Sequence, residues 1–110
     1  MKLAIFHPAA RAAIRLFPEE IRRELGKAIF DLQNGAVLAM PLSRSMPSVH
    51  AGVSELRIRD RSGIYRVFYY HQSSRGVLVF HGFMKKTHTT PKREMDLAKR
   101  RLKELLDEKI

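Results

Sequence analysis

Three segments between residues 55 and 86 constrain the fold more than any other part of the chain. Segments 55–59, 64–70 and 77–86 are rich in β-branched and aromatic residues, and polar turns that contain Gly63 and Gly76 separate them. Runs of this composition joined by short turns with glycine are typical of consecutive antiparallel strands. The sequence therefore predicts a three-stranded antiparallel meander.

A short strand and two helices are predicted to precede the meander. Residues 2–6 are expected to form the strand and residues 9–16 the first helix, with Pro8 at its first position. Pro18 starts the second helix and Asn34-Gly35 ends it. Apolar side chains recur along this helix at helical spacing: Ile21, Leu25, Ala28, Ile29 and Leu32. The two helices are therefore expected to cover one face of the sheet.

A further helix is predicted after the meander, with the Thr90 hydroxyl as its N-cap and Pro91 at its first helical position. Its apolar face consists of Met95, Ala98, Leu102 and Leu105. Residues 35–52, rich in proline and serine, are expected to form an irregular connection. The predicted fold class is α+β, with one domain over residues 1–110. In this fold an N-terminal strand and two helices pack on an antiparallel sheet of about four strands, and a C-terminal helix follows.

The charge balance indicates a polyanionic partner. The formal net charge is +10 and the isoelectric point about 10.5. Such a field favours nucleic acid first and an anionic membrane surface second, although it also keeps a small protein soluble. The absence of cysteine excludes disulfides and thiolate metal sites. The apolar run before His7-Pro8 is too short for a secretory signal or a membrane span, so we expect a cytoplasmic protein without a membrane partner.

Cations are expected to gather on one face of the predicted sheet. Leu56 and Ile58 share one face of the first meander strand, so alternation places the neighbouring arginines on the other face. Pairing would bring the arginine of the second strand beside them, and the lysines that end the third strand would join. The predicted phosphate-binding residues are Arg57, Arg59, Arg66, Lys85, Lys86 and, in the basic first half of the last helix, Arg93.

Three sequence blocks carry a resemblance to a known family. They are Gly52 to Arg59 (GVSELRIR), Tyr65 to Tyr69 (YRVFY) and His81 to Thr87 (HGFMKKT), the last leading into Thr90-Pro91 and a helix. With the predicted order of strands and helices, these blocks resemble the RelE/ParE superfamily of bacterial type II toxins. The pattern is most similar to the phage-derived, HigB-like branch of RelE-type toxins.

The resemblance implies an endoribonuclease that cleaves mRNA, usually in the decoding site of the ribosome, and uses neither a metal nor another cofactor. The RNA 2′-hydroxyl attacks the adjacent phosphorus. By the same resemblance Arg66 stabilises the charged phosphorane, Arg57 and Arg59 hold phosphate or assist proton transfer, and Lys86 and His88 occupy catalytic positions. A cognate antitoxin is also implied, and we expect a small helix-turn-helix protein encoded by the adjacent reading frame.

Side-chain chemistry limits the catalytic roles. Arginine does not readily give up a proton at neutral pH and therefore suits phosphate binding and charge stabilisation. His88 is the leading acid or base, Lys85 and Lys86 become bases if crowding lowers the pKa, and His81 suits a structural role better. Glu55 is expected to orient an arginine by an ion pair and less so to act as a base. No carboxylate is expected near His81 or His88, so we expect no metal site.

Two other functions fit the same residues. The protein could bind RNA or the ribosome without cleaving it, or it could inhibit DNA gyrase as ParE-like relatives do. Mapping of new 5′ ends in mRNA distinguishes cleavage from binding alone, because a protein that only binds RNA leaves no new ends. A gyrase cleavage assay tests the second alternative. The clustered cations favour RNA over gyrase as the target. At most one of the meander aromatics is assigned to stacking on RNA bases and the others to the core: Tyr65, Phe68, Tyr69 and Phe83.

Overall fold

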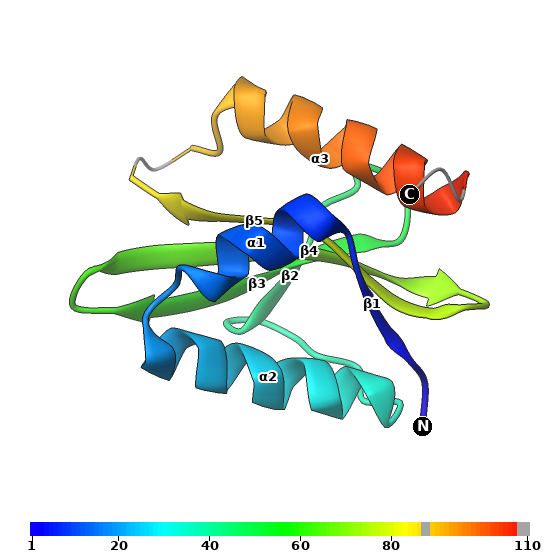
Figure 1. Cartoon of the computed structure of the whole chain (residues 1–110), viewed down its shortest axis with the longest axis horizontal. Coiled ribbons are helices and arrows are strands. Elements are labelled where there is room, and N and C mark those ends of the chain that lie inside the picture. The colour runs from blue at the N-terminus through cyan, green and yellow to red at the C-terminus, as the bar shows by residue number, and fades with distance from the viewer. Residues whose placement is uncertain (87–88, 108–110) are drawn as a thin grey trace.

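The computed structural model describes residues 1–86 and 89–107, in which three helices pack on the two faces of one sheet. The elements in chain order are β1 (Ala4–Phe6), α1 (Pro8–Arg15), α2 (Glu19–Gln33), β2 (Ser43–Ser45), β3 (Val53–Asp60), β4 (Gly63–Ser73), β5 (Gly76–Lys85) and α3 (Lys92–Leu106). Figure 1 shows the sheet as the middle layer, with α2 on one side and α3 on the other. The predicted α+β class is confirmed. Within the described ranges, none of the helices combines the length and apolarity needed to cross a membrane.

The sheet has five strands in the order β1-β5-β4-β3-β2. The predicted meander is present, since β3, β4 and β5 pair antiparallel in sequence order, while β1 joins β5 in parallel. The fifth strand, β2, lies within the segment that we expected to be irregular. It has three residues and depends on β3 for its pairing, so it is too short to produce an alternating pattern in the sequence.

Strand alternation divides the core into two layers. On the side of α1 and α2 the sheet buries Leu56, Ile58, Tyr65, Val67, Tyr69, Val77 and Val79. On the side of α3 it buries Val53, Phe68, Leu78 and Phe80. The predicted apolar stripe of α2 is fully buried, and in α3 the predicted face is buried at Ala98, Leu102 and Leu105. Burying each large apolar side chain contributes about 1.5–3 kcal/mol, so both faces hold their helices mainly by apolar contact.

The starts of two helices compare differently with the sequence prediction. Pro8 is the first residue of α1 as predicted, and the His7 ring nitrogen Nδ1 accepts a hydrogen bond from the backbone of the first turn. At α3 the prediction of Thr90 as the N-cap is wrong. Pro91 occupies that position with an extended backbone (φ −59°, ψ 144°), and no side chain caps the helix. The helix therefore begins one residue later than predicted.

An irregularity in the pairing of β4 with β5 sets the side chains at the centre of β5. Phe68 lies opposite His81 and Tyr69 opposite Val79, so Phe80 has no direct partner. A bulge of this kind lets two successive side chains face the same side of a sheet. Phe80 packs in the core beneath α3, and His81 makes its hydrogen bonds to α3 as well. The bulge therefore gives α3 both an apolar and a polar anchor on β5.

Candidate phosphate-binding site

The strand register brings cations from four strands to one face of the sheet. Arg57 of β3 lies directly opposite Arg66 of β4, and directly opposed residues of antiparallel strands share a face. Arg44 of β2 lies opposite Glu55 of β3 on this face, and the β4–β5 register places Lys85 there too. This is the sheet face that carries α3 farther along the strands. We refer to Arg44, Arg57, Arg59, Arg66 and Lys85 as the cation cluster.

A buried carboxylate lies at the centre of the cation cluster. Glu55 is 2% exposed, and its Oε1 atom lies 3.9 Å from Arg57 Nε and 3.9 Å from Arg66 NH1. Arg66 is itself only 4% exposed. These separations are longer than the roughly 2.7–2.9 Å of a charge-assisted hydrogen bond. Glu55 therefore balances the charge of both arginines, as expected for an orienting ion pair, without saturating their donors.

Three buried polar atoms of the cluster have no hydrogen-bond partner. They are Glu55 Oε2, Arg57 Nε and Arg66 Nε, and no other buried side-chain nitrogen or oxygen in the described residues lacks a partner. Folded proteins satisfy most buried polar groups, because leaving one unpaired costs about 1–3 kcal/mol. Their concentration at one place indicates that the cluster is built to receive polar atoms from a ligand.

Two cavities adjoin the cluster. One has a volume of about 360 Å³ and is lined by Arg57, Arg59 and Arg66 together with Glu24, Pro41, Leu42, Ile58 and Ile64. The other, of about 320 Å³, is lined by Arg44, Glu55 and Lys85 together with Met46, Ser48, Thr89, Thr90 and Met95. Three arginines of the cluster therefore line the first cavity, while Arg44, Glu55 and Lys85 line the second.

The electrostatic environment affects the acidity of two members of the cluster. Burial lowers the pKa of the Arg66 guanidinium; Glu55 opposes this change and Arg57 adds to it. Arginine remains charged at neutral pH even so, which makes Arg66 a fixed positive group. Burial also lowers the pKa of the Lys85 ammonium, with Arg66 as the next cause. A lysine with a lowered pKa exchanges its proton more readily, which suits it for proton transfer.

The structure brings together some of the predicted site residues and leaves others apart. Arg57, Arg59, Arg66 and Lys85 belong to one cluster. Lys86 is exposed just after β5 and lines neither cavity, and Arg93 is exposed in the first turn of α3. Neither has a hydrogen bond or ion pair to the described residues of the cluster. His88 lies outside the described residues, and its catalytic role stays a prediction.

Arg44 is a member of the cluster that the sequence did not point to. It lies in the middle of β2, directly opposite Glu55. The neighbouring Ser43 is buried, and its hydroxyl forms a 2.6 Å hydrogen bond with the Tyr69 hydroxyl, which fixes β2 on the sheet. A basic residue between two serines after a proline was the available signal, but the strand that orients it was not recognisable.

His81 has a carboxylate beside it, so the expectation that none lies near is wrong. Its Nε2 atom is 2.8 Å from Glu94 Oε1, and its Nδ1 atom is 2.7 Å from Arg101 NH1. Arginine can only donate, so Nδ1 accepts and Nε2 carries the proton that is donated to Glu94. Burial, with Arg101 as a further cause, lowers the pKa of His81. These contacts agree with the structural role favoured for this histidine.

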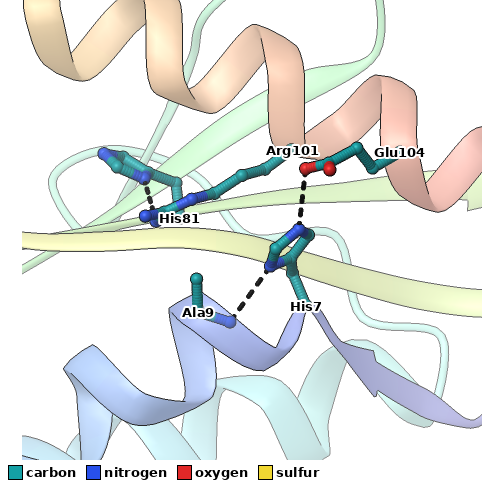
Figure 2. A network of polar contacts seen from close by, with 5 residues as sticks. All are labelled: His7, Ala9, His81, Arg101 and Glu104. Atoms are coloured by element: carbon teal, nitrogen blue, oxygen red, sulfur yellow. Dashed lines mark hydrogen bonds and ion pairs between the residues drawn. The ribbon is translucent and has the colours of Figure 1, made fainter. Parts of the chain in front are cut away.

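A second histidine contacts the same helix. It is His7, which follows β1, the strand that pairs with β5 at the edge of the sheet. His7 Nε2 donates to Glu104 Oε1 of α3 at 3.0 Å, while Nδ1 accepts from the Ala9 backbone at 3.1 Å (Figure 2). Figure 2 shows the His81–Arg101 contact and the His7–Glu104 contact side by side beneath α3. Within the described ranges, no three histidine or acidic side chains gather as a metal site. The two histidines therefore fix α3 on the sheet.

Comparison with known proteins places this fold in a family. The sequence matches the family model of the phage-derived Gp49-like proteins (DUF891) over residues 12–103, which include the whole cation cluster. No curated protein matches the chain. The Gp49-like proteins are a family of RelE/HigB-type toxin-like proteins. With most of its length matched, the chain belongs to the Gp49-like family of phage-derived, toxin-like proteins.

Proposed function

We propose that this protein is the toxin of a type II toxin–antitoxin system, of the HigB-like branch, and that it cleaves mRNA without a metal ion. The observation that carries the proposal is the cation cluster, in which two buried guanidinium nitrogens have no hydrogen-bond partner among the described residues. Phosphate oxygens are acceptors of the kind that these nitrogens lack. The proposed setting is the cytoplasm, where mRNA is the substrate and the ribosome presents it.

Cleavage within RNA develops negative charge on the phosphorane oxygens. Arg57 and Arg66 lie directly opposite each other on adjacent strands, and both form an ion pair with the buried Glu55 carboxylate, which orients their guanidinium groups before substrate binds. Preorganised donors of this kind stabilise a transition state without reorganisation, and removing one costs about 10²- to 10³-fold in rate. The proposed role of Arg66 and Arg57 is to stabilise the phosphorane, and that of Arg59 and Arg44 is to hold the flanking phosphates.

The partner that silences the toxin is proposed to be a helix-turn-helix antitoxin that presents acidic or amphipathic segments. The formal net charge of +10 favours such a partner over a basic or neutral one. An antitoxin that covers the cation cluster would compete with RNA for the same phosphate-binding groups.

The test is incubation of the purified protein with ribosomes and mRNA, followed by mapping of new 5′ ends. We expect cleavage, and we expect Arg57→Ala to slow it at least about 10²-fold. The matched control is Arg11→Ala, which removes an exposed arginine of α1 far from the cluster and should cleave normally. Absence of new ends would favour a non-catalytic RNA-binding module, and accumulation of complexes in which gyrase has cut DNA would favour a gyrase inhibitor.

A further inference from the structure

The three unpartnered atoms of the cluster differ in what they need. Arg57 Nε and Arg66 Nε are donors, whereas Glu55 Oε2 is an acceptor. A phosphodiester offers only acceptors, so a phosphate group alone would satisfy both arginines and leave the carboxylate oxygen unpaired. A single ligand that satisfies all three atoms would carry an anion and a hydrogen-bond donor next to each other.

RNA carries that pair of groups and DNA does not. The ribose 2′-hydroxyl is a donor, and the 3′-phosphate of the same nucleotide is the adjacent anion. A carboxylate kept only to neutralise arginines would be expected to pair with them closely and in bidentate fashion. Glu55 instead lies 3.9 Å from both arginines, lines a cavity of about 320 Å³ and keeps Oε2 without a partner in the described part of the chain.

We propose that Glu55 binds the 2′-hydroxyl and acts as the general base, and that Lys85, which lines the same cavity, is the general acid. This inference rests on the proposed function and assigns its two proton-transfer roles. The 2′-hydroxyl proton passes to Glu55 Oε2 as the O2′–P bond forms. The P–O5′ bond breaks, and the leaving 5′-oxygen takes its proton from Lys85 Nζ. The products are a 2′,3′-cyclic phosphate and a 5′-hydroxyl, and proton exchange with water restores both residues.

The position of Lys85 supports the second role. Its strand, β5, lies on the opposite side of β4 from Glu55, so the two groups approach a bound linkage from different sides. Arg66 of β4 lies between them, where the phosphorane would be held. The burial that lowers the Lys85 pKa also makes its ammonium a better proton donor.

The base is tested by single-turnover cleavage of an mRNA fragment with one mapped cut site. Glu55→Gln keeps the shape of the side chain but cannot take a proton, so we expect a rate loss of about 10²- to 10⁴-fold. We also expect the acid limb of the pH–rate profile to disappear, while binding of the same fragment with a 2′-deoxy nucleotide at the cut site stays equal or tighter. Glu20→Gln, an exposed carboxylate of α2, is the charge-matched control and should behave as wild type.

The acid is tested with a substrate in which sulfur replaces the bridging 5′-oxygen at the cut site. A thiolate leaves without being protonated, so Lys85→Met should be slow on normal RNA and regain the wild-type rate on the sulfur substrate. Glu55→Gln should remain slow on both, because the 2′-hydroxyl still needs a base. Failure of the sulfur substrate to rescue Lys85→Met would overturn the role of Lys85.

The outcomes for this inference and for the proposed function are separate. If the wild-type protein makes no cut, the proposed function fails. If the wild type cleaves and Glu55→Gln cleaves within about threefold of it with the same pH profile, the function stands and the base assignment is overturned. If Glu55→Gln does not fold, Glu55→Asp decides. Its carboxylate is set back by one methylene, so a rate loss of at least about tenfold with the acid limb retained supports the assignment, and a wild-type rate overturns it.

Discussion

The buried Arg66–Glu55 pair gives the sharpest test of how the cation cluster is held. At the observed 3.9 Å and an effective dielectric constant of about 20, the Coulomb attraction of one such pair is about 4 kcal/mol. Replacing Arg66 by Met leaves a carboxylate that is 2% exposed with Arg57 as its remaining ion-pair partner, but it also removes repulsion between the two arginines. We therefore expect Arg66→Met to lower the free energy of unfolding by about 3 kcal/mol.

A double-mutant cycle isolates this interaction. Glu55→Gln alone should also destabilise the protein, because Arg57 and Arg66 then lose their common counter-charge. The double variant Glu55→Gln/Arg66→Met has no buried charge to balance at these two positions, so its stability should lie within about 1 kcal/mol of wild type. The assay is urea denaturation at neutral pH followed by far-ultraviolet circular dichroism, with the coupling energy taken from the four unfolding free energies.

The control cycle uses an exposed pair that is closer together. Glu19 and Arg23 on α2 lie 3.0 Å apart, with side chains that are 75% and 72% exposed. Water screens this pair, so its coupling energy should be below about 0.5 kcal/mol despite the shorter distance. A coupling energy for Arg66–Glu55 as small as that of the control would refute the reasoning, because burial would then add nothing to the interaction.

Three other predictions concern binding, pH and backbone geometry. Affinity for a non-cleavable RNA should fall with salt, and in a NaCl titration Arg44→Gln should reduce the log–log slope by about 0.7, the value for one phosphate contact, while Arg11→Gln leaves it unchanged. Burial lowers the pKa of His81 in the folded state, so its contribution to stability is fully present above about pH 6.5 and is lost as the pH falls through the lowered pKa. Urea denaturation across this range should show a smaller acid-side loss for His81→Gln, which can still donate to Glu94 and accept from Arg101. Gly76→Ala should lower the unfolding free energy by more than about 1 kcal/mol, because Gly76 has φ of 134° and an added Cβ would collide with the Leu3 carbonyl oxygen; an unchanged denaturation midpoint would contradict it.

The meander, and the face of the sheet on which its arginines lie, were predictable because both follow from local rules. Alternation fixes which side Arg57 takes, and the short turn between β3 and β4 fixes which residue comes opposite. That residue is Arg66. The apolar stripes of α2 and α3 were predictable for the same reason, since helical spacing alone selects the buried side chains.

The other features depend on contacts that no local pattern reveals. The three residues of β2 form a strand because they pair with β3. The position of Arg44 opposite Glu55 therefore could not be predicted from the residues next to it in the sequence. Glu94 meets His81 only because the β5 bulge turns that histidine toward α3. The prediction that Lys86 joins Lys85 assumed that both lysines follow the strand to the same patch. In the structure β5 ends at Lys85, and Lys86 is exposed beyond it.

The parallel pairing of β1 with β5 bears on how the molecule is made. Residues 4–6 are synthesised before their partners, residues 77–79, so a growing polypeptide carries β1 without this neighbour until β5 has been translated. The hydrogen bond of His7 forms later still, because its partner, Glu104, lies in α3. The β1 edge of the sheet and its contact with α3 can therefore form only after β5 and α3 have been translated, so the meander is able to pair before β1 joins it.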